Sequence, residues 1–89
     1  MEGKMAFETQ SLDRIKRQFT EMGAKTPSMW WEHGTLWIDN PTEGDLQVIK
    51  DAMVEDILAP EYTVQFNCLK ATKTEPWDQW AMDIVEKAA

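Results

Sequence analysis

Residues 28–40 read SMWWEHGTLWIDN, and this stretch carries the strongest indication of a β-hairpin in the sequence. His33 and Gly34 separate two runs rich in aromatic and β-branched residues, where a two-residue turn with positive φ is expected. This turn sets four cross-strand pairs: Met29 with Ile38, Trp30 with Trp37, Trp31 with Leu36, and Glu32 with Thr35. The hairpin therefore anchors the prediction of the whole fold.

The predicted hairpin has two different faces, because side chains along a strand alternate. One face is apolar and suits a core: Met29, Trp31, Leu36 and Ile38. The other face holds a tryptophan pair among polar groups: Trp30, Glu32, Thr35, Trp37 and Asp39. A slip of one residue at the turn would exchange the two faces, so this division depends on the position of the turn.

The composition indicates one small globular domain, residues 1–89, with 43% hydrophobic and 28% charged residues. The net charge of −7 argues against nucleic acid and anionic membrane surfaces as partners, because an acidic surface repels phosphate. Cys68 is the single cysteine, which excludes an intramolecular disulfide framework. No apolar run is long enough to span a bilayer and no signal segment is present, so we expect a soluble, cytoplasmic protein.

Two amphipathic helices are expected on either side of the hairpin. In residues 11–22 Ser11 is placed to cap a helix with an apolar stripe, and Gly23 is placed to end it. In residues 41–58 Asn40 is the expected cap, followed by Pro41 at the first helical position and a further apolar stripe up to Pro60.

Three further elements complete the predicted chain. Residues 62–70 alternate cleanly between apolar and polar and predict a half-buried strand, with Cys68 on its apolar side. Residues 4–9 are a weaker candidate strand. A last helix is expected to begin near Pro76 after a Thr74 cap, because apolar residues recur at helical spacing. Its stripe consists of Trp77, Trp80, Ala81, Ile84 and Ala88.

This order predicts an α+β fold in which two helices pack on one face of a small antiparallel sheet. With residues 4–9 as a strand, it is the ferredoxin-like βαββαβ arrangement plus a C-terminal helix. Without that strand, a three-stranded α-β-β-α-β-α order is the alternative. In both cases the far face of the sheet is the candidate binding surface, together with the last helix. The residues assigned to it are Trp30, Glu32, Trp37, Asp39, Thr63, Gln65, Asn67, Trp77 and Trp80.

The expected function is a non-catalytic interaction module, because tryptophan often dominates the binding energy of interfaces. The patch would be covered by the C-terminal helix, by a second copy in a homodimer, or by a protein or small apolar ligand. A dimeric ferredoxin-like enzyme or ligand binder with a pocket on the same face is the main alternative. An acidic helix at residues 41–58 that fits a basic groove is a third. No catalytic group, cofactor or metal site is predicted, and His33 is expected at a turn tip.

Overall fold

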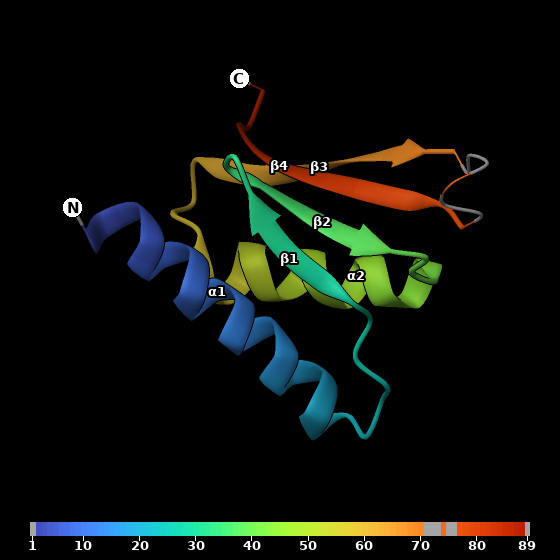
Figure 1. The fold of residues 1–89 in the computed structure, drawn as a ribbon. Coiled ribbons are helices and arrows are strands. Elements are labelled where there is room, and N and C mark those ends of the chain that lie inside the picture. The colour runs from blue at the N-terminus through green and yellow to red at the C-terminus, as the bar shows by residue number, and fades with distance from the viewer. Residues whose placement is uncertain (1, 71–73, 75–76, 89) are drawn as a thin grey trace.

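Two helices pack on one face of a four-stranded antiparallel sheet in the computed structural model, which describes residues 2–70, 74 and 77–88 (Figure 1). The elements are α1 (Glu2–Glu21), β1 (Met29–Glu32), β2 (Thr35–Asp39), α2 (Glu43–Ala52), the π-helical turn η1 (Met53–Ile57), β3 (Tyr62–Leu69) and β4 (Gln79–Glu86). The strand order is β1-β2-β4-β3, and all neighbouring strands are antiparallel. The predicted α+β class, with helices on one face of an antiparallel sheet, is confirmed.

The hairpin of β1 and β2 has the predicted turn and register. His33 and Gly34 adopt φ values of 54° and 80°, so both central turn residues lie in the left-handed region. Trp30 pairs with Trp37 and Trp31 with Leu36, and the other two predicted pairs also form. The two faces of the hairpin are therefore divided as the alternation predicts.

Helix α1 replaces the strand predicted at residues 4–9, and Ser11 is not its cap. Phe7, Ser11, Ile15 and Phe19 recur at a spacing of four on the side of the helix that meets the sheet. Ser11 is 1% exposed. Its hydroxyl oxygen accepts a hydrogen bond from Trp31 Nε1 at 3.2 Å and donates one to the Glu8 carbonyl at 3.0 Å. Ser11 is therefore a buried serine with both of its hydrogen bonds made inside the apolar stripe of one long helix. In the sequence, such a serine looks like the cap at the start of a shorter helix.

Gly23 ends α1 as predicted. Its φ is 71°, its N–H donates to the Thr20 carbonyl at 3.0 Å, and the Ala24 N–H donates to the Phe19 carbonyl at 3.0 Å. This is the hydrogen-bond pattern of a Schellman motif, which favours glycine because of the positive φ.

Helix α2 begins two residues later than predicted. The Thr42 side chain accepts from the Asp45 N–H at 3.0 Å, and the Asp45 carboxylate accepts from the Thr42 N–H at 3.1 Å, which forms a capping box. Asn40 instead adopts a φ of 46° and donates its N–H to the Asp78 carbonyl at 2.8 Å. Asn40 is therefore held by the chain leading into β4 and is not the helix cap.

Strand β4 replaces the predicted C-terminal helix; the expected helix start at Pro76 lies outside the described residues. The sequence fits both periods, since Trp80, Met82 and Ile84 also alternate as in a strand. Met82 is fully buried although the helical stripe omits it. β3 pairs with β4 from Gln79 to Glu86 and β2 pairs with it from Gln79 to Met82, and this tertiary pairing outweighs a local helical pattern.

The element order is therefore αββαββ, and the ferredoxin-like βαββαβ order is not confirmed. The alternative α-β-β-α-β-α order is right for its first five elements and wrong for the last. Strand β4 lies between the hairpin and β3, and it completes the sheet that residues 4–9 were expected to complete.

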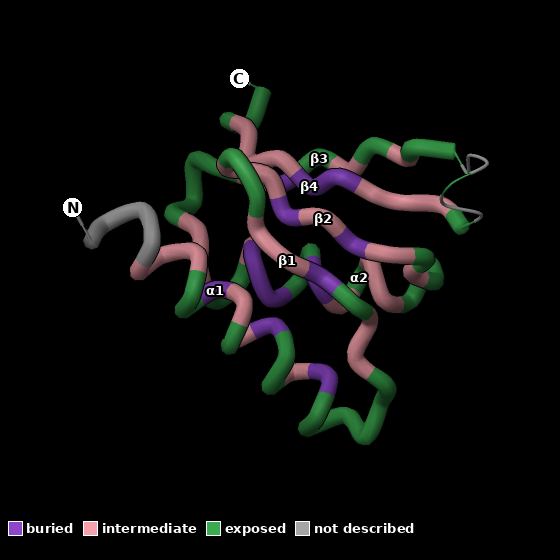
Figure 2. Tube along the Cα trace, viewed as in Figure 1, coloured by how far each residue is buried: buried purple, intermediate pink, exposed green. Residues whose placement is uncertain are grey.

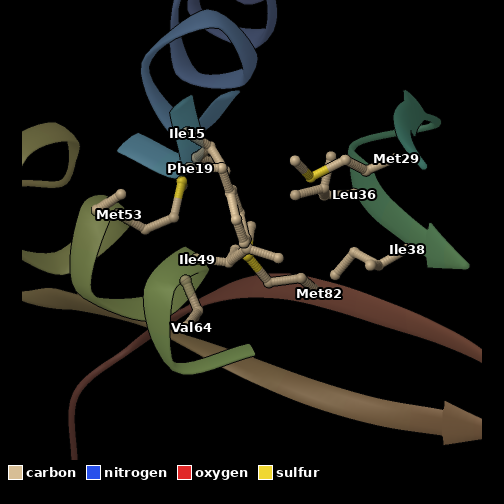
Figure 3. Packing of buried hydrophobic residues seen from close by; sticks show 10 residues of the cluster. Ile15, Phe19, Met29, Leu36, Ile38, Ile49, Met53, Val64 and Met82 are labelled. Carbon is tan, nitrogen blue, oxygen red and sulfur yellow. The ribbon is translucent and has the colours of Figure 1, made fainter. Parts of the chain in front are cut away.

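The core lies between the helices and the sheet. Figure 3 shows Ile15 and Phe19 of α1 pointing toward Met82 of β4, with Met53 of η1 beside them. Figure 2 shows that buried residues recur along α1, with exposed and intermediate residues between them, and that β1, β2 and β4 hold buried residues next to intermediate ones. The helices therefore cover one face of the sheet, which we call the covered face, and leave the other face to solvent.

Candidate interaction surface

The sheet face turned away from α1 and α2 is not covered by any described element (Figure 1). We call it the open face. Its strand residues follow from the registers and the alternation of side chains: Trp30 and Glu32 of β1; Thr35, Trp37 and Asp39 of β2; Gln79, Ala81, Asp83 and Val85 of β4; and Thr63, Gln65, Asn67 and Leu69 of β3. The covering of the tryptophan pair by a C-terminal helix is therefore wrong.

The two tryptophans lie in a row that crosses the whole sheet. Trp30 pairs with Trp37, Trp37 with Ala81, and Ala81 with Asn67. Both indoles are half-buried, and Ala81 is 9% exposed although no described backbone element covers it. The larger neighbouring side chains of the row therefore shield its methyl group.

The indole nitrogens of the pair differ in their hydrogen bonding. Trp30 Nε1 donates to Glu32 Oε1 at 3.2 Å, at an exposed position. Trp37 Nε1 has no hydrogen-bond acceptor among the described residues and is not a buried atom. The Trp37 indole therefore offers both an apolar surface and a free N–H donor to a partner.

Acidic groups lie on both sides of the tryptophan row. Asp83 Oδ1 accepts from the Thr35 hydroxyl at 2.8 Å, and Asp39 Oδ1 accepts from Gln79 Nε2 at 3.1 Å. With Glu32 there are three carboxylates on the open face of the described strands, and no Lys or Arg. Asp83 and Gln79 were missed by the sequence analysis because they fall in the segment that was predicted as a helix.

The remaining predicted surface residues do not form one group. Thr63, Gln65 and Asn67 share the open face but are separated from β2 by β4. Trp80 lies on the covered face, where it lines an open hollow of about 530 Å³ with Phe66 and Leu46. Trp77 is 40% exposed and precedes β4. The grouping of Trp77 and Trp80 with the open face depended on the helix and is wrong for Trp80.

The two candidate chemical groups, His33 and Cys68, lie in different parts of the fold. His33 is at the turn tip with its side chain 90% exposed, and its Nε2 lies 3.8 Å from Glu32 Oε2. Cys68 is half-buried on the covered face, opposite Trp80. Among the described residues no group of three or more His, Cys, Asp or Glu could hold a metal ion.

Comparisons with protein-family models, curated proteins and solved structures give no match. Within the described part of the chain, neither helix has the length and apolar character needed to cross a membrane.

Proposed function

We propose that the protein is a non-catalytic interaction module whose open face binds a basic patch on another protein. The observation that supports this proposal is the combination of Trp30 and Trp37 with three carboxylates, and no Lys or Arg, on the uncovered strands. Tryptophan contributes strongly to binding when it is buried at the centre of an interface. Carboxylates beside it complement Lys or Arg on the partner.

Lysine or arginine would gain two kinds of interaction on this surface. A guanidinium or ammonium placed over an indole face is stabilised by about 0.5–1 kcal/mol at an exposed site, and by more when water is excluded. Glu32, Asp39 and Asp83 lie on the same face and would pair with the same cations. Asp39 and Asp83 are already oriented by Gln79 and Thr35, so less side-chain freedom is lost on binding.

Charge argues against stacking two copies of the open face on one another. Such a dimer would enclose the carboxylates of both copies without a Lys or Arg from the strands to pair them. Like charges across an interface are unfavourable, and burial makes them more so. A basic partner therefore fits the open face better than a second copy of the chain.

The two other functions considered from the sequence have less support. The hollow beside Trp30 is about 190 Å³ and lies against α1, between Glu8, Leu12 and Trp31. Because it lies against α1, this hollow is not the pocket on the open face that the ligand-binding alternative requires. On the acidic helix, Asp56 is engaged by Arg14 Nη2 at 2.9 Å and Asp51 by Gln47 at 2.8 Å.

The proposal is tested by titrating the protein with an amphipathic peptide in which Arg and Leu alternate, followed by backbone and indole NMR shifts. We expect shifts concentrated at Trp30, Trp37 and Asp83, and an affinity that falls as salt is added. A peptide with Glu in place of Arg should not bind. If the Arg peptide does not bind, or shifts residues of α1 and α2 instead, the proposal is wrong.

Matched variants make this test specific. Trp37→Ala should weaken peptide binding about tenfold or more, since a central aromatic anchor is lost. Met22→Ala, which removes an exposed apolar side chain elsewhere, should leave it unchanged. Glu32→Gln should weaken binding and Glu55→Gln should not, although both exchanges remove one exposed carboxylate. Equal effects of the two glutamate exchanges would show attraction by net charge alone.

A further inference from the structure

Strand β3 forms one edge of the sheet, and no described segment pairs with its outer side. Edge strands usually carry protection against pairing with other chains, in the form of a charge, a proline, a bulge or a short length. Strand β3 spans eight residues, YTVQFNCL, and contains no charged residue and no proline. Its register with β4 runs without interruption from Tyr62 to Leu69, so it has no bulge.

The outward backbone groups of β3 can be identified from its pairing with β4. The Lys87 N–H donates to the Glu61 carbonyl at 2.9 Å, in the same register that pairs Tyr62 with Glu86. Hydrogen-bonded pairs alternate along an antiparallel ladder, so Thr63, Gln65 and Asn67 bond to β4. The N–H and C=O groups of Val64, Phe66 and Cys68 therefore point away from the sheet.

The charges that flank β3 favour an antiparallel partner of the same sequence. Glu61 precedes the strand and Lys70 follows it, and both are exposed. When two copies of β3 lie antiparallel, the end of each copy that carries Glu61 lies beside the end of the other copy that carries Lys70. Parallel alignment would place like charges together. The side chains opposite one another within the strands would be uncharged.

Exposed apolar groups lie at the same edge. Tyr62 and Leu69, near the two ends of β3, are 38% and 45% exposed. On the covered face, the hollow lined by Phe66 and Trp80 also borders this strand. A second strand added at this edge would bury part of this apolar surface, which favours association.

We infer that two copies of the chain pair through antiparallel β3 strands, centred on Gln65 or on Phe66, and form one continuous sheet of two four-stranded halves. The backbone groups that point outward belong to even-numbered residues, so even-numbered residues of one copy pair with even-numbered residues of the other. The side chains of these residues lie on the side of the sheet that the helices cover. The helices of both copies therefore lie on the same side of the joined sheet. The two open faces then point in the same direction. This inference goes beyond the proposed binding of a basic partner and does not depend on it.

Amide hydrogen exchange at micromolar and millimolar protein concentration tests the pairing directly. The amides of Val64, Phe66 and Cys68 should exchange about tenfold or more slowly at the higher concentration, because they become hydrogen-bonded between copies. The amides of Thr63, Gln65 and Asn67 should be protected at both concentrations by β4. If the outward amides exchange equally fast at both concentrations, the inference is wrong.

Sedimentation velocity of two variants with the same change of charge locates the interface. In the inferred dimer, Gln65→Lys places the two new lysines, one from each copy, opposite or next to one another at the two-fold axis that relates the β3 strands. This variant should therefore be monomeric. Gln10→Lys, at an exposed position on α1, should leave the dimer intact. Circular dichroism confirms that each variant is folded, and Asn67→Lys replaces Gln65→Lys if that variant is not.

The Trp37→Ala variant separates this inference from the proposed function. We expect it to dimerise like the wild type while it loses binding of the Arg peptide. Loss of the dimer in Trp37→Ala, together with its persistence in Gln65→Lys, would place self-association on the open face and overturn pairing through β3. A wild type that stays monomeric at millimolar concentration would also overturn it.

Discussion

The two faces of the sheet use the same four described strands but differ in what contacts them. On the covered face, Leu36, Ile38 and Met82 are fully buried under the helices. On the open face, Trp30 and Trp37 are half-buried without any described element above them. The neighbouring residues Trp30 and Trp31 show the difference most directly. A large apolar side chain stabilises the fold on one face, whereas on the other it is available to a partner.

The largest difference in stability between the two faces is expected in β4, where covered and open positions lie close together. Met82→Ala removes a fully buried side chain and should lower the free energy of unfolding by about 2–5 kcal/mol. Val85→Ala truncates a half-buried side chain on the open face and should cost about 1 kcal/mol or less. Urea denaturation measures both values. Equal losses would mean that the open face is covered by the protein itself.

A smaller effect is expected from the hydrogen bonds of the adjacent tryptophans. Ser11→Ala removes the buried acceptor of the Trp31 indole N–H and should cost about 1–2 kcal/mol. Glu32→Ala removes the exposed acceptor of the Trp30 indole N–H, which water can replace, and should change stability by less than about 0.5 kcal/mol. Thermal denaturation of both variants provides the comparison, and a reversed order would argue against the assignment of the two faces.

The smallest effect concerns the start of the covering helix α2. Thr42→Ala should cost about 1 kcal/mol, because the Asp45 N–H loses its capping acceptor. Asn40→Gly should change stability by a few tenths of a kcal/mol, since glycine adopts the positive φ of Asn40 without strain. Chemical denaturation of the two variants checks this. No loss of stability in Thr42→Ala would contradict Thr42 as the cap.

The sequence analysis was correct where a local signal determined the structure. The turn at His33 and Gly34 set the hairpin register, and with it the separation of Trp30 and Trp37 from Trp31. It was wrong where a tertiary contact decided. Ser11 is buried and accepts a hydrogen bond from the Trp31 indole. For this reason a residue that was predicted to cap a helix lies in the middle of α1. Residues 79–86 fit a helix by spacing and form a strand because β3 pairs with all of them and β2 pairs with residues 79–82.

These errors changed the candidate surface more than the fold class. With β4 in the sheet, Trp80 moves to the covered face, and Asp83 joins Glu32 and Asp39 on the open face. The added carboxylate strengthens the argument for a basic partner. The central position of β4 also leaves β3 at an edge of the sheet, which a sequence-based prediction ending in a helix did not reveal.

The central claim is that residues 79–86 form the middle strand and thereby leave the tryptophan pair on an open face. Nuclear Overhauser contacts between α-protons test it most directly. Because the Asn40 N–H donates to the Asp78 carbonyl, Trp37 and Ala81 form a non-hydrogen-bonded pair, with Cα atoms about 4.5 Å apart. We predict a strong contact between the α-protons of Trp37 and Ala81, and one between those of Phe66 and Met82. Contacts between residues three apart throughout 77–88, with neither cross-strand contact, would instead show a helix and contradict the account.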